Sequence, residues 1–172
     1  MFIHKILSLL LEYPDAQTRA ILPELAALIS DDASLDTAER AVLERFLNRM
    51  ADQAWEDLEA AYVATFDLSP AHSLHLTHHI FGDDRGRGPA LIDLTEYYKN
   101  FGFEAVSTEL PDYLPLVLEF AAQLDSTEAR LFLNPFVKIL SQLSENLEQS
   151  GSAYAPLMRL AEAQAQLVRQ AA

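Results

Sequence analysis

Apolar residues recur every three or four positions along most of this 172-residue chain. Such spacing places them on one face of an α-helix. No segment alternates apolar and polar residues as a half-buried strand does, and no internal repeat is visible. We therefore predict an all-α protein, one compact bundle of about eight or nine helices in a single domain over residues 1–172. The pattern is clearest at Val42, Leu43, Phe46, Leu47 and Met50, and again at Trp55, Leu58, Tyr62, Thr65 and Phe66.

Local signals place the ends of the expected helices in the first third of the chain. The apolar segment 2–11 predicts a core helix, and residues 15–30 predict a second helix that Pro23 should break or kink. Asp36 and Glu39 have the spacing of a capping box, with Asp36 as the N-cap of the next helix.

Similar signals divide the rest of the chain. A short helix is expected over about 71–81, followed by a loop at 82–88. Another helix is expected over about 112–124, with Asp112 as its N-cap and Pro115 in its first turn. The remaining expected boundaries are Pro89 near a helix start, Gly102 after its end, a cap at Ser126 or Thr127, a kink or split at Asn134-Pro135, and a last helix between Gly151 and Arg169.

Composition narrows the possible functions. The formal net charge is −14 and the isoelectric point about 4.5, which argues against a nucleic-acid partner and favours either a basic partner or solubility alone. The absence of cysteine excludes thiolate zinc sites and cysteine nucleophiles and fits a reducing compartment. Because the segment 2–11 is too short to cross a bilayer, we expect a soluble cytoplasmic protein without direct membrane insertion.

The histidines raise the question of a metal site. If 71–81 is helical, His72, His75 and His79 share one face, and His75 and His79 at positions i and i+4 could chelate a metal. However, Leu76 occupies the position at which the zinc-protease motif HExxH requires glutamate. Histidines at the rim of the core, each donating to a carboxylate or carbonyl, are the favoured interpretation, so no metal is predicted.

Charged residues around the glycines at 82–88 also have two interpretations. Arg85 and Arg87 could bind a carboxylate or phosphate on a ligand. Alternatively, one of them pairs with Asp83, Asp112 or Glu109 and holds two loops together. Glu109 and Asp112 could form an acid–base pair, but no nucleophile accompanies them, and capping by Asp112 is favoured.

Several short motifs follow one another in order between residues 62 and 120. They read Tyr62-x-x-x-Phe66-Asp67; Ser73-Leu74-His75-Leu76 with His79 and Gly82; Arg85-x-Arg87-Gly88-x-Ala90; and Glu109-Leu110-Pro111-Asp112 with Leu114-Pro115 and Leu118-Glu119-Phe120. Together they resemble the TorD-like family of helical chaperones, and within it the NarJ branch of nitrate reductase molybdenum-cofactor assembly chaperones, also called delta subunits. One departure is Tyr113, where that family usually has histidine.

The resemblance implies a chaperone, not an enzyme, with no cofactor of its own. Such a protein binds the N-terminal leader, or its remnant, on the catalytic subunit of a molybdoenzyme. It holds the apo-subunit until the molybdenum cofactor is inserted. Respiratory nitrate reductase is the first choice of client, and the chaperone is expected to be a monomer or a swapped dimer. The alternatives are a metal-dependent hydrolase using His75 and His79, or a generic helical adaptor.

The resemblance also indicates where the client peptide binds. The side chains of six residues are expected to lie near one another around an apolar groove: Tyr62, Phe66, His75, His79, Leu114 and Leu118. The full set of expected client-binding or motif residues adds Arg85, Arg87, Glu109, Pro111, Asp112 and Tyr113.

Overall fold

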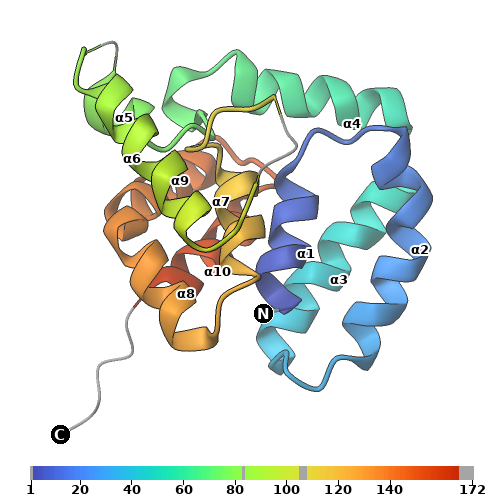
Figure 1. The fold of residues 1–172 in the computed structure, drawn as a ribbon. Coiled ribbons are helices and arrows are strands. Elements are labelled where there is room, and N and C mark those ends of the chain that lie inside the picture. The colour runs from blue at the N-terminus through green and yellow to red at the C-terminus, as the bar shows by residue number, and fades with distance from the viewer. Residues whose placement is uncertain (1, 83, 105–107, 167–172) are drawn as a thin grey trace, which may run out of the picture.

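A computed structural model of the chain describes residues 2–82, 84–104 and 108–166. Over these ranges it contains ten α-helices and no strand, so the predicted all-α class is confirmed, although one helix, α5, is a single turn (Figure 1). The α-helices are α1 (Phe2–Leu11), α2 (Ala16–Asp31), α3 (Thr37–Asp52), α4 (Trp55–Tyr62), α5 (His78–Phe81), α6 (Arg87–Asn100), α7 (Leu114–Ala121), α8 (Ser126–Leu133), α9 (Val137–Gln149) and α10 (Ala155–Ala165).

The local signals near the N-terminus had mixed outcomes. The capping box is confirmed, because the Asp36 carboxylate accepts from the backbone N–H of Glu39 and the Glu39 carboxylate accepts from the backbone N–H of Asp36. Of the break or kink expected at Pro23, the break is wrong, since α2 continues through this residue. Asp15 caps the start of α2 by accepting from the backbone N–H of Thr18 at 2.8 Å.

The core forms around α1 and α7. These helices lie side by side in the centre of the molecule, and both α1 and α9 pack against α10 (Figure 1). Because their side chains point into this junction, Ile6, Leu118 and Phe120 are almost completely buried. No helix in the described ranges is both long enough and apolar enough to span a membrane.

The segment that was expected to be a helix over 71–81 folds differently. It begins as a 3₁₀ turn, Pro70–His72, continues through 73–77 outside any helix, and ends in α5. His75 instead forms an antiparallel bridge with Tyr113, while the N–H of Leu76 donates to the carbonyl of Asp112 at 3.0 Å. Pairing with a distant segment therefore replaces the helix and brings two of the motifs together.

The other helix boundaries are mostly near their expected places. The helix α6 begins at Arg87, inside the segment 82–88 that was expected to be a loop, and Asp125 caps α8 in place of Ser126 or Thr127. The end expected near Arg169 lies outside the described residues, and α10 closes at Ala165. The confirmed boundaries are Gly102 after α6 at φ +71°, Pro115 in the first turn of α7, the split between α8 and α9 at Asn134-Pro135, and Gly151 before α10 at φ +68°.

Candidate functional site

A fully buried carboxylate joins the two paired motif segments. Asp112 has no exposed surface, and one of its oxygens accepts from the backbone N–H of Thr77 at 3.0 Å and from the Thr77 hydroxyl at 2.5 Å. Its other oxygen lies 3.4 Å from Nδ1 of His75. The expectation that Asp112 caps the following helix is wrong, because its acceptors are occupied by donors 35 and 37 residues away in sequence.

These donors also decide the charge state of Asp112. Burial alone raises the pKa of a carboxyl group, because it penalises the charged form. Here the hydrogen bonds from His75 and Thr77 outweigh burial and hold the pKa of Asp112 at about 2. Asp112 is therefore a carboxylate at neutral pH, and it serves as an acceptor within the fold.

Arg87 completes this network. Its Nε donates to the Thr77 hydroxyl at 3.1 Å, and its Nη2 lies 3.4 Å from the Asp112 carboxylate. One of the intramolecular pairings considered from the sequence is thus confirmed. Arg85 is exposed on the loop before α6 and takes no part in the network, and Asp83 lies outside the described residues.

The histidines do not form the metal-binding face that a helix would have given them. His75 faces Asp112, whereas His79 directs its Nε2 to the carbonyl of Ser73 at 2.7 Å. Burial lowers the pKa of His79, which favours the neutral ring, and that ring donates to Ser73. Across the described ranges, no three His, Cys, Asp or Glu side chains are placed to hold a metal ion.

Two tyrosines connect the paired segments to α1 and α4. The Tyr62 hydroxyl donates to the carbonyl of Leu11 at 3.0 Å and lies 2.9 Å from the Tyr113 hydroxyl. Because the single hydroxyl proton of Tyr62 is used on Leu11, Tyr113 must donate to Tyr62. Burial, followed by the interaction with Tyr113, raises the pKa of Tyr62, so this chain of hydrogen bonds stays protonated at neutral pH.

A π-helical turn after α4 carries the motif residues Phe66 and Asp67 and directs Phe66 toward Tyr62. It spans Val63–Asp67 after α4 and is closed by the N–H of Leu68, which donates to the Val63 carbonyl at 3.1 Å. A π-helical turn is wider than an α-helical turn because its hydrogen bonds span five residues, and such turns often occur at functional sites. Its consequence here is that the ring of Phe66 lies 4.8 Å from the ring of Tyr62.

The α1–α2 connection supplies a further wall. Trp55 Nε1 donates to the carbonyl of Pro14 at 2.9 Å and fixes this connection against the start of α4. Tyr13 then meets the ring of Tyr62 edge to face, with 5.5 Å between ring centres.

Together these elements enclose a hollow of about 190 Å³, which we call the tyrosine pocket. Two carboxylates, Asp67 and Glu109, stand among its aromatic walls. Burial raises the pKa of Tyr113 to about 12, partly opposed by the Tyr62 hydrogen bond, and the charges of Glu12, Glu109 and Asp67 add to the increase. The lining residues are Tyr13, Tyr62, Phe66, Asp67, Ser73, Leu74, His75, Glu109 and Tyr113.

The structure gathers some of the expected site residues and separates others. Leu114 and Leu118 have no exposed surface and belong to the core, not to the pocket wall. The carbonyl of Pro111 accepts from the Tyr98 hydroxyl at 2.8 Å, beside a different hollow. The expected residues that line the tyrosine pocket are Tyr62, Phe66, His75, Glu109 and Tyr113, with Asp112, His79 and Arg87 supporting the segments around it.

Two important residues were missed from the sequence. Tyr13 lies outside the ordered motifs, and its contact with Tyr62 spans the α1–α2 connection. Thr77 was not predicted as a site residue, although its hydroxyl donates to Asp112 and accepts from Arg87. A lone threonine carries no sequence signal for such a role, whereas an aromatic residue directly before Pro14 was visible.

Most of the chain, including nearly all of the tyrosine pocket, matches a known protein family. A family model described as "Nitrate reductase delta subunit" matches residues 14–159, a range that contains the whole tyrosine pocket except Tyr13.

Individual relatives agree with that match. The "Nitrate reductase molybdenum cofactor assembly chaperone NarJ" of Escherichia coli K12 is 39% identical over 155 residues, which cover 90% of this chain and 66% of that protein. This chain thus matches slightly less than two thirds of that relative. A "Probable nitrate reductase molybdenum cofactor assembly chaperone NarJ" of Bacillus subtilis 168 is 37% identical over 90% of this chain and 83% of its own length. The "Nitrate reductase-like protein NarX" of Mycobacterium tuberculosis H37Rv is 35% identical over 86% of this chain but 22% of its own length.

Proposed function

This chain belongs to the nitrate reductase delta subunit family, and from that premise we propose that it is an assembly chaperone and not an enzyme. In this proposal it binds the catalytic subunit of a nitrate reductase through the N-terminal leader of that subunit, or the remnant of the leader. It holds the apo-subunit while the molybdenum cofactor is inserted. The names of the relatives favour this function over a metal-dependent hydrolase or a generic helical adaptor.

The observation that carries the proposal is the tyrosine pocket, which is assembled from separate motifs and suits a basic side chain. Aromatic faces attract a guanidinium or ammonium group, and carboxylates form charge-assisted hydrogen bonds with it. The pocket offers both, with Tyr13, Tyr62 and Phe66 as rings and Asp67 and Glu109 as carboxylates. We propose that a lysine or arginine of the leader enters here.

The overall charge supports the same partner. A net charge of −14 attracts a basic segment over several ångströms and raises its rate of encounter. Ordering a flexible leader costs about 2–5 kcal/mol, so the complex is expected to be reversible. Reversible binding suits a chaperone that must release its client after cofactor insertion.

Titration calorimetry with a synthetic leader tests this function. The peptide would be the N-terminal segment of the nitrate reductase catalytic subunit from the same organism. Replacing both carboxylates of the pocket, Asp67→Asn with Glu109→Gln, should weaken binding by roughly a hundredfold or more, because each charge-assisted hydrogen bond contributes about 1.5–3 kcal/mol.

A matched control is available on another face. Glu24 is exposed on α2 and lines none of the hollows described here, so Glu24→Gln changes one charge without touching the pocket. This variant should bind within about twofold of the original protein. If the peptide and the full apo-subunit both fail to bind the unaltered chain, the chaperone function is wrong. If Glu24→Gln weakens binding as much as the pocket variant does, the pocket is not the site.

We also propose that the helical domain acts in the cytoplasm. The absence of cysteine fits a reducing compartment. Cell fractionation with detection of the untagged protein would test this assignment.

A further inference from the structure

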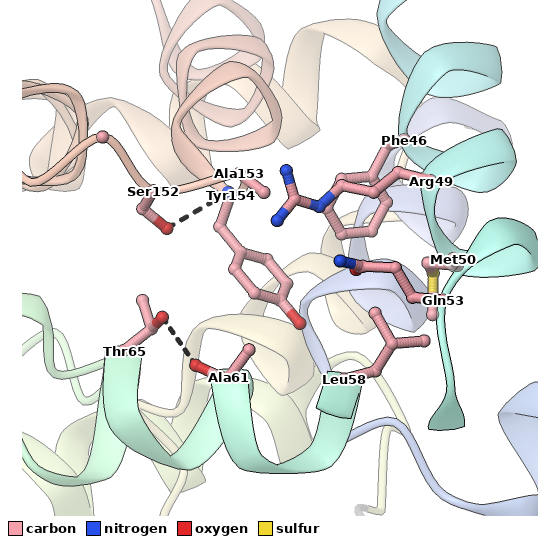
Figure 2. A pocket seen from close by; sticks show the side chains of 11 residues that line it. Phe46, Arg49, Met50, Gln53, Leu58, Ala61, Thr65, Ser152, Ala153 and Tyr154 are labelled. Carbon is pink, nitrogen blue, oxygen red and sulfur yellow. Dashed lines mark hydrogen bonds between the residues drawn. The ribbon is translucent and has the colours of Figure 1, made fainter. Parts of the chain in front are cut away.

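A second hollow differs from the tyrosine pocket in the sign of its charge, because an arginine lines it instead of carboxylates. It measures about 160 Å³ and is enclosed by the C-terminal end of α3, by α4, and by the connection between α9 and α10 (Figure 2). Its apolar walls are Phe46, Met50 and Leu58. It contains no carboxylate, although the chain has 26 acidic residues against 12 Lys and Arg. We call it the arginine pocket.

Tyr154 points a hydroxyl group without a partner into this hollow. Its ring extends from the α9–α10 connection toward α4 (Figure 2), and the side chain is only 6% exposed. The ring is held by Phe46 and Phe66, with ring centres 5.2 and 4.8 Å away. Within the described part of the chain, the hydroxyl makes no hydrogen bond, and it is not one of the fully buried side-chain atoms that lack a partner, so it is accessible from the hollow.

The hydroxyl of Tyr154 is available as a donor. Burial raises the pKa of Tyr154 to about 12, although the positive charge of Arg49 opposes this. The group therefore carries its proton at neutral pH. A ligand that accepts a hydrogen bond here would engage a donor that the fold does not use.

Two further donors come from α3. Arg49 and Gln53 are one helical turn apart, and their side chains reach toward the Tyr154 ring (Figure 2). No described carboxylate lies within salt-bridge distance of Arg49, in contrast to Arg159, which pairs with Glu148 and Glu162. The pocket thus presents one positive charge and two neutral donors, with no acceptor of opposite charge.

We propose that the arginine pocket binds a carboxylate group attached to an apolar body. Guanidinium binds a planar carboxylate through two parallel hydrogen bonds, and the hydroxyl and amide can satisfy the remaining lone pairs. A single positive charge matches a monoanion better than a phosphate dianion, which the net charge of −14 repels more strongly.

The apolar part of such a ligand would have space next to the residues that bind its carboxylate. A neighbouring hollow of about 360 Å³ shares Phe46, Arg49, Ser152 and Ala153 with the arginine pocket and continues along α3. Apolar side chains provide most of its surface, and Arg45 stands at it without lining the arginine pocket. A ligand can therefore place its carboxylate at Arg49 and its carbon chain in this extension.

Nuclear magnetic resonance titration of the complete chain tests the assignment. Hexanoate represents a free organic acid, acetyl-leucine represents the C-terminus of a peptide, and hexanamide is the neutral control. Both acids should shift the side-chain Nε–H signal of Arg49 and saturate at millimolar concentrations, whereas hexanamide should not. Tighter binding of acetyl-leucine would identify a peptide terminus as the source, and tighter binding of hexanoate a small acid.

Three variants make the test specific. Arg49→Gln should abolish binding, and Tyr154→Phe, which removes only the hydroxyl, should weaken it by about tenfold. Lys138→Gln loses one positive charge at an exposed position of α9 that lines neither hollow, and it should bind within about twofold. Thermal melting checks that each variant is folded.

Three results would overturn the proposal. If Lys138→Gln and Arg49→Gln weaken binding equally, the attraction is unspecific. If inorganic phosphate binds as tightly as the acids, or if no acid saturates the signal, the pocket is not a carboxylate site.

Discussion

At the scale of single residues, two fully buried polar side chains affect stability in opposite ways. Asp112 receives hydrogen bonds from Thr77 and lies beside His75 and Arg87, so its charge is compensated. His4 on α1 is equally buried, but neither of its ring nitrogens has a partner in the described structure. A buried group costs little when it is paired and about 1–3 kcal/mol when it is not.

Removing the charge of Asp112 should therefore be strongly destabilising. Asp112→Asn replaces one acceptor oxygen by an NH₂ group that faces other donors, and we expect a loss of about 3–5 kcal/mol in the free energy of unfolding. Urea unfolding at pH 7 measures this loss. Asp93→Asn, at an exposed position of α6, is the control and should change stability by less than about 0.5 kcal/mol. Equal effects would contradict the role assigned to Asp112.

The pKa of His4 predicts a pH dependence of stability. Burial, followed by the charges of the N-terminus and Arg130, lowers the pKa from 6.5 to about 4. Between these values the unfolded chain binds a proton that the folded chain does not, so stability falls as the pH is lowered from 6.5 to 4, by about 3 kcal/mol.

The substitution His4→Leu should remove most of that dependence and stabilise the protein at every pH, because it eliminates two unpaired nitrogens. Urea unfolding at pH 7, 6, 5 and 4.5 compares the slopes. His79, whose pKa burial also lowers, retains a smaller slope in the variant. An unchanged slope would show that His4 is not held neutral in the folded state.

At the scale of elements, local signals predicted the helices that depend on neighbouring residues. The capping box at Asp36 and the glycine at 151 are examples, because the deciding contacts lie within a few residues. The 73–77 segment could not be predicted in this way. His72, His75 and His79 have helical spacing, but the backbone of 73–77 bonds to residues 112–114, which no local pattern reveals.

The capping box provides a quantitative test at this scale. Asp36→Ala leaves the backbone N–H groups of Ala38 and Glu39 without their acceptor. The loss in the free energy of unfolding should be about 1 kcal/mol, with a range of about 0.5–2 kcal/mol. Chemical denaturation followed by circular dichroism measures it, and Asp36→Ser should recover most of the loss. Failure of serine to restore stability would mean that capping is not the cause.

At the scale of the whole molecule, the tyrosine pocket shows how far the sequence could lead. Ordered motifs identified most of its lining, including Tyr62, His75 and Tyr113. Nothing in the amino-acid pattern indicated that Leu114 and Leu118 would be buried in the core, or that Tyr13 would close one wall of the pocket. Those placements depend on how α1, α4 and α7 pack, and packing is a property of the complete fold.

The net charge makes a prediction at the same scale. If a basic leader is captured by the field of an acidic protein, its association rate should fall several-fold between about 50 and 300 mM salt, while its dissociation rate changes less. Stopped-flow fluorescence with a labelled leader measures both rates. An association rate that is independent of salt would contradict electrostatic capture.

The most direct test of the chaperone function is capture of the client in cells. The protein would be isolated from cells that express its native operon but are starved of molybdenum, so that the apo-subunit accumulates, and its partners would be identified by mass spectrometry. We predict recovery of a nitrate reductase catalytic subunit, and loss of that subunit when its N-terminal leader is deleted or when Asp67 and Glu109 are neutralised. Recovery of no reductase, or undiminished recovery without the leader, would contradict a leader-binding chaperone.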